Sequence, residues 1–288
     1  SNGLVPIRLS EKEYVRAHDF RRYLHKNLED FIVETPLKEP LSELIKDYDN
    51  SIDQSIEKSW KPYDFENLDI DAFLDELSID KSVKVSPIRG GYENAKNRIN
   101  EFIKNGYCDY AQYRSDPSKK ASSEMSPYFH FGQISTHEVF EKIVQHEAWT
   151  PEKINPSLAG RREGWWGGSL NMESFFDELI TWRELGYHTC VRRANYNQYS
   201  SLPEWAIKTL DEHSSDTREY IYTLDQLTYS QTHDEIWNAA QNQLREEGVI
   251  QNYLRMLWGK KILEWSPNPQ AALSYMITLN DRYSLDGR

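Results

Sequence analysis

The apolar residues of this chain recur at helical spacing almost throughout. In residues 12–32, and again in residues 174–185, they fall every three or four positions and so share one face of a helix. Only residues 3–9 read like a strand, and Pro6 there removes a backbone donor that a central strand would need. The sequence therefore predicts an all-α fold of many helices.

Residues 33–88 break the helical pattern. They are acidic and interrupted by prolines, which indicates an irregular connector with short helices. Regular helices resume at residue 90, and Ser135 with Glu138 has the spacing of a capping box at the start of one of them. The chain stops without a capping residue or a tail, so we expect a fragment of a longer protein.

Charge and cysteine content limit the partner and the compartment. The 288 residues carry a formal net charge of −12, which weighs against a nucleic-acid partner because phosphates favour basic surfaces. Four local basic pairs still leave a basic face open: Lys119-Lys120, Arg161-Arg162, Arg192-Arg193 and Lys260-Lys261. Two cysteines are too few for a secreted disulfide scaffold, and no apolar run is long enough to cross a membrane. We expect a cytoplasmic protein.

A serine-rich turn within residues 110–135 is the first candidate site. Ser122, Ser123 and Ser126 precede Pro127 and the start of a helix. Hydroxyls and free backbone N–H groups in such a turn can bind a phosphate or a pyrophosphate. An ordinary serine-rich loop fits the same residues, so the pattern alone leaves both interpretations open.

The order of residues in this segment resembles the flavin pyrophosphate loop of the DNA photolyase and cryptochrome family. Tyr110 and Arg114 have the family's spacing, and the run SSEMSPYFHFG follows them. Three further blocks are similar to family motifs: FFDELITWRE (175–184), IWNAAQ to LRMLWGKKILEW (236–265) and LNDRYSLDGR (279–288). The last two resemble the class II branch, which repairs cyclobutane pyrimidine dimers.

The same resemblance predicts how the chain divides into a junction with a linker and a catalytic domain. Residues 3–9 with residues 17–24 are similar to the join between the family's antenna domain and its catalytic half. We accordingly expect residues 1–88 to be a remnant of that junction followed by the interdomain linker. Residues 89–288 are expected to form the helical FAD-binding catalytic domain, with its C-terminal end missing.

The resemblance implies that the helical domain holds FAD in a U-shaped conformation. Tyr110 is expected to pack on the flavin, Arg183 to contact the cofactor, and Asn280 to face flavin N5, from which its amide can accept a hydrogen bond. Arg255 and Asp286 would form a charge pair at the isoalloxazine edge, although a purely structural ion pair also fits them. The implied cofactor-binding residues are Tyr110, Ser122, Ser123, Met125, Ser126, Phe175, Arg183, Asn252, Arg255, Asn280 and Asp286.

Glu178 lies on the otherwise apolar face of residues 174–185. In the family the matching carboxylate hydrogen-bonds a thymine of a flipped-out pyrimidine dimer and stabilises its radical anion, so the resemblance implies a catalytic role. Trp182 and Met256 are then expected to offer stacking and apolar surface to the dimer. The residues alone also allow a structural carboxylate at position 178.

Trp258 and Trp265 stand seven residues apart, which is about 10.5 Å along an α-helix. That is long for one fast electron transfer, and Trp237 on the preceding helix could divide the distance. The resemblance implies electron transfer along Trp258, Trp237 and Trp265, which join Glu178 and Asn280 as catalytic residues. By periodicity alone, three tryptophans on packed helices are more typical of a core.

Several residues depart from the class II pattern. Ser115 replaces an Asn, Trp182 replaces an Arg, and Ile250-Gln251-Asn252 replaces Met-His-Gly, which bears on repair and on substrate preference. Residues 161–170 match no motif that we can use. Within them, Trp165-Trp166 is either an exposed contact or local core.

These patterns lead to one hypothesis and two alternatives. The first is a carbon–carbon lyase that repairs UV-induced pyrimidine dimers with light. It would bind FAD and no metal, act on damaged DNA and be monomeric. The second is a cryptochrome-like blue-light photoreceptor without repair, which Gln251 and the net acidity favour. The third is a helical fragment that binds no flavin.

Overall fold

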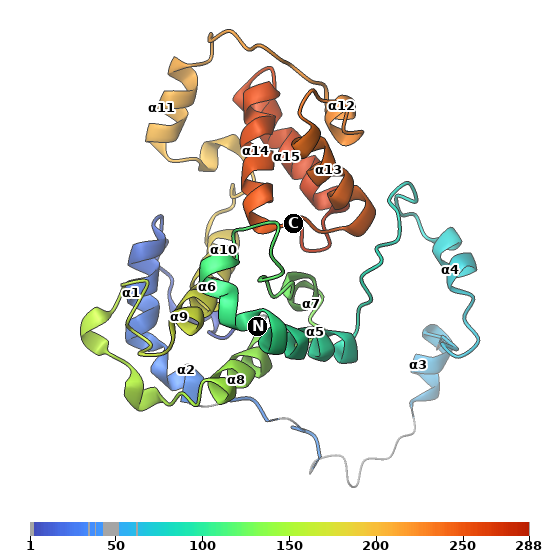
Figure 1. The fold of residues 1–288 in the computed structure, drawn as a ribbon. Coiled ribbons are helices and arrows are strands. Elements are labelled where there is room, and N and C mark those ends of the chain that lie inside the picture. Colours follow the sequence, from blue (N-terminus) through green and yellow to red (C-terminus); the bar gives the residue numbers. More distant parts are fainter. Residues whose placement is uncertain (1–2, 34, 38, 43–51, 62, 288) are drawn as a thin grey trace. The chain divides into compact units, whose positions relative to one another are not determined.

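The computed structural model describes residues 3–33, 35–37, 39–42, 52–61 and 63–287. Within these ranges the chain forms helices and turns and no strand, so the predicted all-α fold is confirmed (Figure 1). The strand-like stretch near the N-terminus contains a short 3-10 helix, η1 (Ile7–Leu9), instead. The chain divides into a main unit, Ser1–Thr35 with Val85–Arg288, and a smaller unit, Pro36–Lys84, and each is described by itself.

After η1, the described part of the main unit continues as a series of helices. In chain order they are α1 (Ala17–Asn27), α2 (Glu29–Val33), α5 (Tyr92–Asn105), η2 (Tyr107–Asp109), α6 (Tyr110–Tyr113), α7 (Ser126–His130), α8 (Thr136–His146), η3 (Pro151–Lys153), η4 (Pro156–Leu158), α9 (Leu170–Phe176), η5 (Asp177–Trp182), α10 (Arg183–Arg192), η6 (Tyr199–Ser201), α11 (Glu204–Glu212), α12 (Leu224–Thr228), α13 (Glu235–Glu247), α14 (Asn252–Trp265) and α15 (Pro269–Tyr283).

In its described residues the smaller unit forms α3 (Gln54–Ser59) and α4 (Ile70–Glu76), and neither helix buries a side chain. The carboxylates of Asp53 and Asp69 accept backbone N–H groups of the first turn and so cap these helices. The irregular helical connector expected from the acidity and the prolines is confirmed. Its assignment as an interdomain linker stays a prediction.

Aromatic side chains dominate the core of the main unit. Trp165 and Trp166 are only 2% and 3% exposed, and the indole N–H of Trp149 donates to the carbonyl oxygen of Trp166 at 2.6 Å. Of the two interpretations of Trp165-Trp166, local core is therefore the correct one.

The capping box predicted at the start of α8 forms only in part. The hydroxyl of Ser135 accepts the backbone N–H of Glu138 at 3.0 Å, as expected. The carboxylate of Glu138 does not return the contact and instead accepts the hydroxyl of Tyr92 at 3.1 Å. The second hydrogen bond of the capping box is therefore replaced by a hydrogen bond between α8 and α5.

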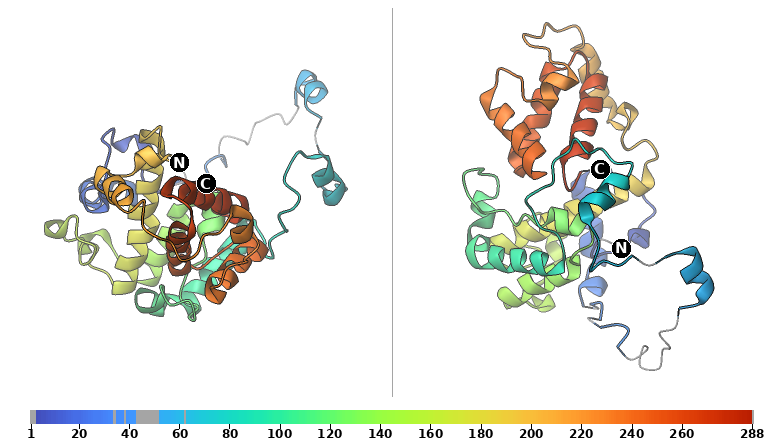
Figure 2. Two further views of the ribbon diagram at one scale, coloured as in Figure 1. Left: turned by 90° about the horizontal axis from the view of Figure 1, so that it is seen from above. Right: turned by 90° about the vertical axis from the view of Figure 1, so that its right-hand side faces the viewer.

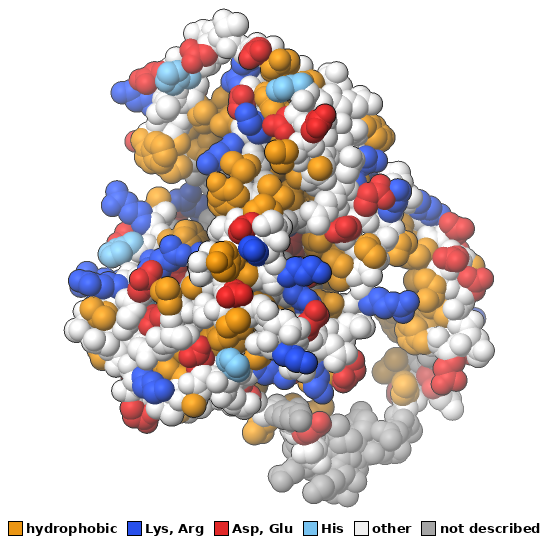
Figure 3. All heavy atoms as spheres, viewed as in Figure 1, with side chains coloured by type: hydrophobic (Ala, Val, Ile, Leu, Met, Phe, Trp, Pro, Cys, Tyr) orange, Lys and Arg blue, Asp and Glu red, His pale blue; other side chains and the backbone are white. Residues whose placement is uncertain are grey.

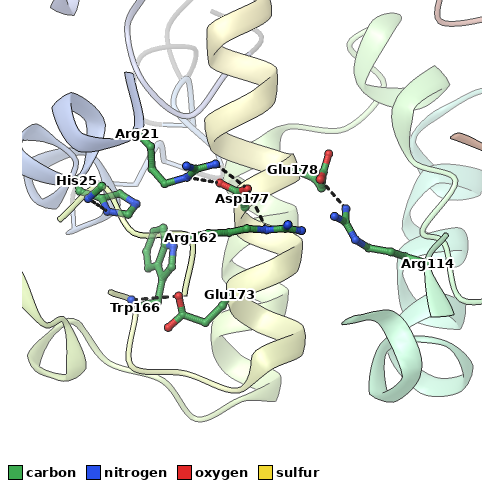
Figure 4. Close-up of polar contacts among 9 residues, drawn as sticks. Arg21, His25, Arg114, Arg162, Trp166, Glu173, Asp177 and Glu178 are labelled. Atoms are coloured by element: carbon green, nitrogen blue, oxygen red, sulfur yellow. Dashed lines mark hydrogen bonds and ion pairs between the residues drawn. The ribbon is translucent and has the colours of Figure 1, made fainter. Parts of the chain in front are cut away.

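A continuous helix runs from residue 170 to residue 192 and widens in its middle. Its ends, α9 and α10, are α-helical, whereas η5 between them is a π-helix. A π-helical turn holds an additional residue and is frequent at functional sites. Here Asp177 and Glu178 point to opposite sides of the helix (Figure 4).

Asp177 joins α1 to this helix. Arg21 donates from Nε to Oδ1 at 2.7 Å and from Nη2 to Oδ2 at 3.0 Å, and both side chains are buried. The Nε of Arg162, on a half-exposed side chain, lies 3.7 Å from Oδ2 (Figure 4). The buried carboxylate is tolerated because both of its oxygens are paired.

The carboxylate of Glu184, on α10, binds backbone N–H groups of the N-terminal segment. The N–H groups of Leu4 and Val5 donate to Oε1 of Glu184 at 2.5 and 3.0 Å. Burial raises the pKa of Glu184, and these two N–H groups oppose that effect. A Cβ at Gly3 would overlap the carboxylate of Glu184, so a larger residue there would require this side chain to move.

His25 of α1 is buried against the segment that contains Gly160 and Trp165. Its ring stacks on Trp165 at 3.9 Å, and its Nδ1 accepts the backbone N–H of Gly160 at 3.1 Å. Burial, helped by the charge of Arg21, lowers the pKa of His25 to about 3. The imidazole therefore stays neutral in the folded protein at pH values where the unfolded chain protonates it.

We expect the free energy of unfolding to fall as the pH drops below about 6.5, where an unfolded histidine takes up a proton. The loss should approach about 1.4 kcal/mol per pH unit at its steepest and should continue towards the folded-state pKa. Urea unfolding of the wild type and of His25→Gln, compared at pH 7.5 and pH 5, isolates this contribution. An equal pH dependence in the two proteins would contradict the assignment.

The C-terminal helices α13, α14 and α15 gather into a bundle (Figures 1 and 2). α13 ends at Gly248, which has a φ of +79°, the left-handed conformation that glycine adopts without strain. The carbonyl oxygen of Gly248 accepts the backbone N–H of Leu285 at 2.8 Å. The segment after α15 is thereby held against the turn between α13 and α14.

Candidate functional site

The candidate residues come from two parts of the main unit, the stretch from α6 to α10 and the helices α13 to α15. Tyr110 opens α6 and is buried, with the rings of Phe102 and Phe175 edge-on to it at 5.7 and 5.3 Å. Burial raises the pKa of Tyr110 to about 12, so its phenol is protonated at neutral pH. Tyr110 and Phe175 therefore form part of one aromatic wall.

The loop between α6 and α7 is held by Arg98 of α5. The guanidinium donates to the carbonyl oxygens of Ser122 and Ser123 at 3.2 and 3.0 Å. Met125 at the end of the loop is buried. Arg98 thus binds the backbone of this loop at the two serines, and its Nε also lies 3.4 Å from Oε2 of Glu124.

Asp286 is the centre of a polar network that joins the two parts. Arg255 donates from Nη1 and Nη2 to Oδ1, each at 3.0 Å. The hydroxyls of Ser284 and Ser126 donate to Oδ1 and Oδ2 at 2.5 and 2.6 Å. Arg255 also donates to Oδ1 of Asn280 at 3.4 Å. Burial would raise the pKa of Asp286, but the charge of Arg255 and the hydroxyl donors outweigh it, and the pKa is lowered.

Arg183 is a second cation near this network. Its guanidinium lies over the rings of Phe129 and Tyr187 at 4.8 and 5.2 Å and donates to the hydroxyl of Tyr187 at 2.8 Å. Burial lowers the pKa of Arg183, while Tyr187, Glu184 and Asp286 act in the opposite direction. Arg183 is therefore close enough to Asp286 for their charges to interact.

Glu178 of η5 forms an ion pair with Arg114, with Nη1 2.5 Å from Oε1 (Figure 4). The guanidinium of Arg114 also lies over the ring of Tyr110 at 5.6 Å. Trp182 and Met256 are 47% and 51% exposed, so both remain accessible to a ligand. The carboxylate is thus held by a cation of the Tyr110 segment.

Trp237 lies between Trp258 and Trp265 in the C-terminal bundle. Its ring is parallel to that of Trp258, at 2° and 6.4 Å, and inclined to that of Trp265, at 70° and 5.7 Å. Its indole N–H donates to the carbonyl oxygen of Trp258 at 3.2 Å. The three buried rings are contiguous, and electron transfer along them stays a prediction.

Direct contacts connect some of the residues that the sequence singles out. Hydrogen bonds join Ser126, Arg255, Asn280 and Asp286. Ring contacts join Tyr110 to Phe175, and Trp237 to Trp258 and Trp265. Among the described residues, no hydrogen bond or ion pair links the remaining serines of the loop or the exposed Asn252 to the hydrogen-bonded set. The roles of all these residues towards a cofactor stay predictions.

The donor set suits a dinucleotide flavin. Arg183 could supply positive charge to an anionic cofactor, the neutral Arg255–Asp286 pair could lie beside a ring, and the hydroxyl of Ser126 can turn to a phosphate oxygen. The amide oxygen of Asn280 can accept a hydrogen bond from a ring N–H. In contrast, no cluster of three or more metal-ligating side chains occurs among the residues that the structure describes.

Comparison with known proteins gives the relationship. No family model matches the chain. The deoxyribodipyrimidine photo-lyase of Potorous tridactylus is 32% identical over 289 residues, which are 100% of this chain and 48% of that protein. The deoxyribodipyrimidine photo-lyase of Methanothermobacter thermautotrophicus is 35% identical over 289 residues, 100% of this chain and 56% of that protein. The chain belongs to the DNA photolyase and cryptochrome family.

This photolyase-family chain spans about half the length of the two curated relatives. A solved structure of a class III photolyase from Agrobacterium tumefaciens aligns with a TM-score of 0.47 at 18% identity, over 100% of this chain and 55% of that one. In the described part of the chain, no helix is both long and apolar enough to span a membrane.

Two contacts at the site escaped the sequence reasoning. The sequence marks Arg114 only as a motif residue, and a separation of 64 positions from Glu178 predicts no pairing between them. In the sequence Gln251 is only a departure from the family's pattern, whereas in the structure its amide makes three hydrogen bonds. A polar residue directly before a predicted helix is a signal for a cap, and it could have been used for Gln251.

Proposed function

We propose that the chain is the catalytic, FAD-binding part of a photolyase that repairs UV-induced cyclobutane pyrimidine dimers in DNA. The observation that carries this proposal is the match of the whole chain to two proteins named deoxyribodipyrimidine photo-lyase. When bound and fully reduced, FAD would supply a light-excited electron to the dimer. The protein would act inside the cell as a monomer.

The residues of the polar network would bind and orient this cofactor. Arg255 and Asp286 compensate each other, so the pair can lie beside a ring without a net charge. Ser126 and Arg183 would contact the pyrophosphate and the ring system, and Asn280 would accept a hydrogen bond from N5. Tyr110 and Phe175 would exclude water from the same site.

Glu178 would hold the dimer. Its pairing with Arg114 orients the carboxylate, so it can accept a hydrogen bond from a thymine N–H. Trp182 and Met256 would cover the faces of the flipped-out bases, as such pockets require. Lys and Arg side chains are scattered among acidic ones on the face seen in Figure 3, so DNA binding would rest on local basic groups.

The test uses the full-length protein. Its absorption spectrum should contain a flavin band near about 450 nm, and light should restore dimer-containing DNA. Bound, photoreducible FAD without repair would favour a cryptochrome-like photoreceptor. A spectrum without flavin would overturn both light-driven functions.

We expect Glu178→Gln to lower the rate of repair about tenfold to a hundredfold, because a charge-assisted hydrogen bond to the substrate becomes a neutral one. FAD binding should change little. Repair kinetics and flavin absorbance measure the two effects separately. Glu163→Gln, which removes the same charge from an exposed position, serves as the control. Equal repair by both variants would rule out a role for Glu178 in the reaction.

A further inference from the structure

The side-chain amide of Gln251 forms hydrogen bonds with two different parts of the main unit, one through its oxygen and one through its nitrogen. As the N-cap of α14, its Oε1 accepts the backbone N–H groups of Tyr253 and Leu254 at 2.7 and 3.1 Å. Its Nε2 donates to the carbonyl oxygen of Arg114 at 2.8 Å. One amide thus caps a helix and links it to a segment 137 positions away.

The chemistry of these contacts is specific to a primary amide. Short side chains such as Ser, Thr, Asp and Asn usually cap helices, and each accepts the N–H groups with one oxygen. The contact to Arg114 needs in addition an N–H donor at the end of a longer side chain. Gln251 is the residue type that supplies the acceptor and the donor at the same time.

The two segments that Gln251 links carry different parts of the candidate site. Arg114 pairs with Glu178 through its guanidinium, while its carbonyl oxygen receives the Gln251 amide. α14 carries Arg255 and Met256 on its first turns. A shift at position 251 would therefore move the cofactor side of the site relative to the carboxylate side.

We propose that Gln251 is a positioning residue, whose amide fixes the start of α14 against the Arg114 segment and so sets the separation of Arg255 from Glu178. The inference rests on the proposed function for its consequence, since these are the residues assigned to FAD and to the dimer. In this chain Gln251 therefore supports the repair site, although it departs from the family's pattern.

The first test separates the cap from the link in the ligand-free protein. Gln251→Ser keeps an N-cap hydroxyl but cannot donate to Arg114, whereas Gln251→Ala loses both contacts. The amides of Asp116 and Lys119, which bond within the Arg114 segment, should exchange with solvent several-fold faster in both variants. The amides of Tyr253 and Leu254 should exchange faster only in Gln251→Ala.

The second test measures FAD affinity in the full-length protein. Gln251→Ser and Gln251→Ala should both weaken FAD binding about fivefold to tenfold, as expected for a lost hydrogen bond. Gln243→Ser, on the neighbouring α13, should leave it unchanged. Gln251→Glu should bind weakly at neutral pH, because its carboxylate faces a carbonyl oxygen. Its affinity relative to the wild type should recover as acid converts that carboxylate to an O–H donor.

The outcomes are distinct. Wild-type exchange at Asp116 and Lys119 in Gln251→Ser would overturn the inference, and so would a Gln251→Glu variant without pH-dependent recovery of FAD affinity. A wild-type protein that binds no FAD would overturn the proposed function instead. The exchange measurement would then still decide whether the link through Gln251 exists.

Discussion

A Trp237→Phe variant is expected to bind FAD normally, but the bound flavin should no longer be photoreduced in steady light. The Trp237 ring contacts both Trp258 and Trp265, whose positions on α14 are about 10.5 Å apart along the helix axis. Phenylalanine fills much of the same volume but is far harder to oxidise than an indole. Electron transfer would then have to cross the whole separation in one step, and its rate falls exponentially with distance.

The fold should survive this change. Trp237→Phe removes one hydrogen bond, from the indole N–H to the carbonyl oxygen of Trp258, at a cost of about 1 kcal/mol. Flavin absorbance under blue light with an external reductant measures photoreduction, and circular dichroism monitors the helices. Trp205→Phe, at a residue that is 72% exposed on α11, is the matched control. Unchanged photoreduction in Trp237→Phe would show that the three rings serve only as core.

Replacing Arg21 by Met is expected to lower the free energy of unfolding by about 3–5 kcal/mol. Arg21 satisfies both oxygens of Asp177, and the side chains are 10% and 4% exposed, so its removal leaves a buried carboxylate without its main partner. Arg162 is near enough to recover part of this loss. Urea denaturation monitored by tryptophan fluorescence gives the change.

The double variant Arg21→Met, Asp177→Leu distinguishes the effect of an unpaired buried charge from the effect of lost packing. Replacing both partners by apolar residues of similar size should restore most of the stability, because no charge is then left buried. If the double variant were as unstable as Arg21→Met, packing of the arginine stem would explain the loss. A loss below about 1 kcal/mol in the single variant would show that Arg162 replaces Arg21 fully.

Helical periodicity was sufficient to predict the all-α fold, because 3.6-residue spacing is a local property of the chain. The motif residues led to a polar network that includes Arg255, Asn280 and Asp286, and the structure brings these three together. Contacts between segments that are far apart in the chain could not be predicted from the sequence. Arg21 and Asp177 are 156 positions apart, and no local pattern encodes such a pairing.

The interpretation of single residues depended on burial, which a sequence does not give. Trp165 and Trp166 are core, although the sequence also allowed an exposed contact. Gln251 is a helix cap and a link between segments, which a comparison with the family's histidine could not show. The roles of Glu178 and the three tryptophans in photochemistry stay predictions.

The π-helical turn of η5 makes the central helix intolerant of a change in length. In an α-helix each residue rotates the chain by about 100°, so deleting one residue within Asp177–Trp182 would restore α-helical winding and turn the two ends relative to each other. Either Asp177 would leave Arg21 or Glu184 would leave the backbone of Leu4 and Val5. A deletion within this turn would therefore cost one of these two contacts, whichever end of the helix rotated.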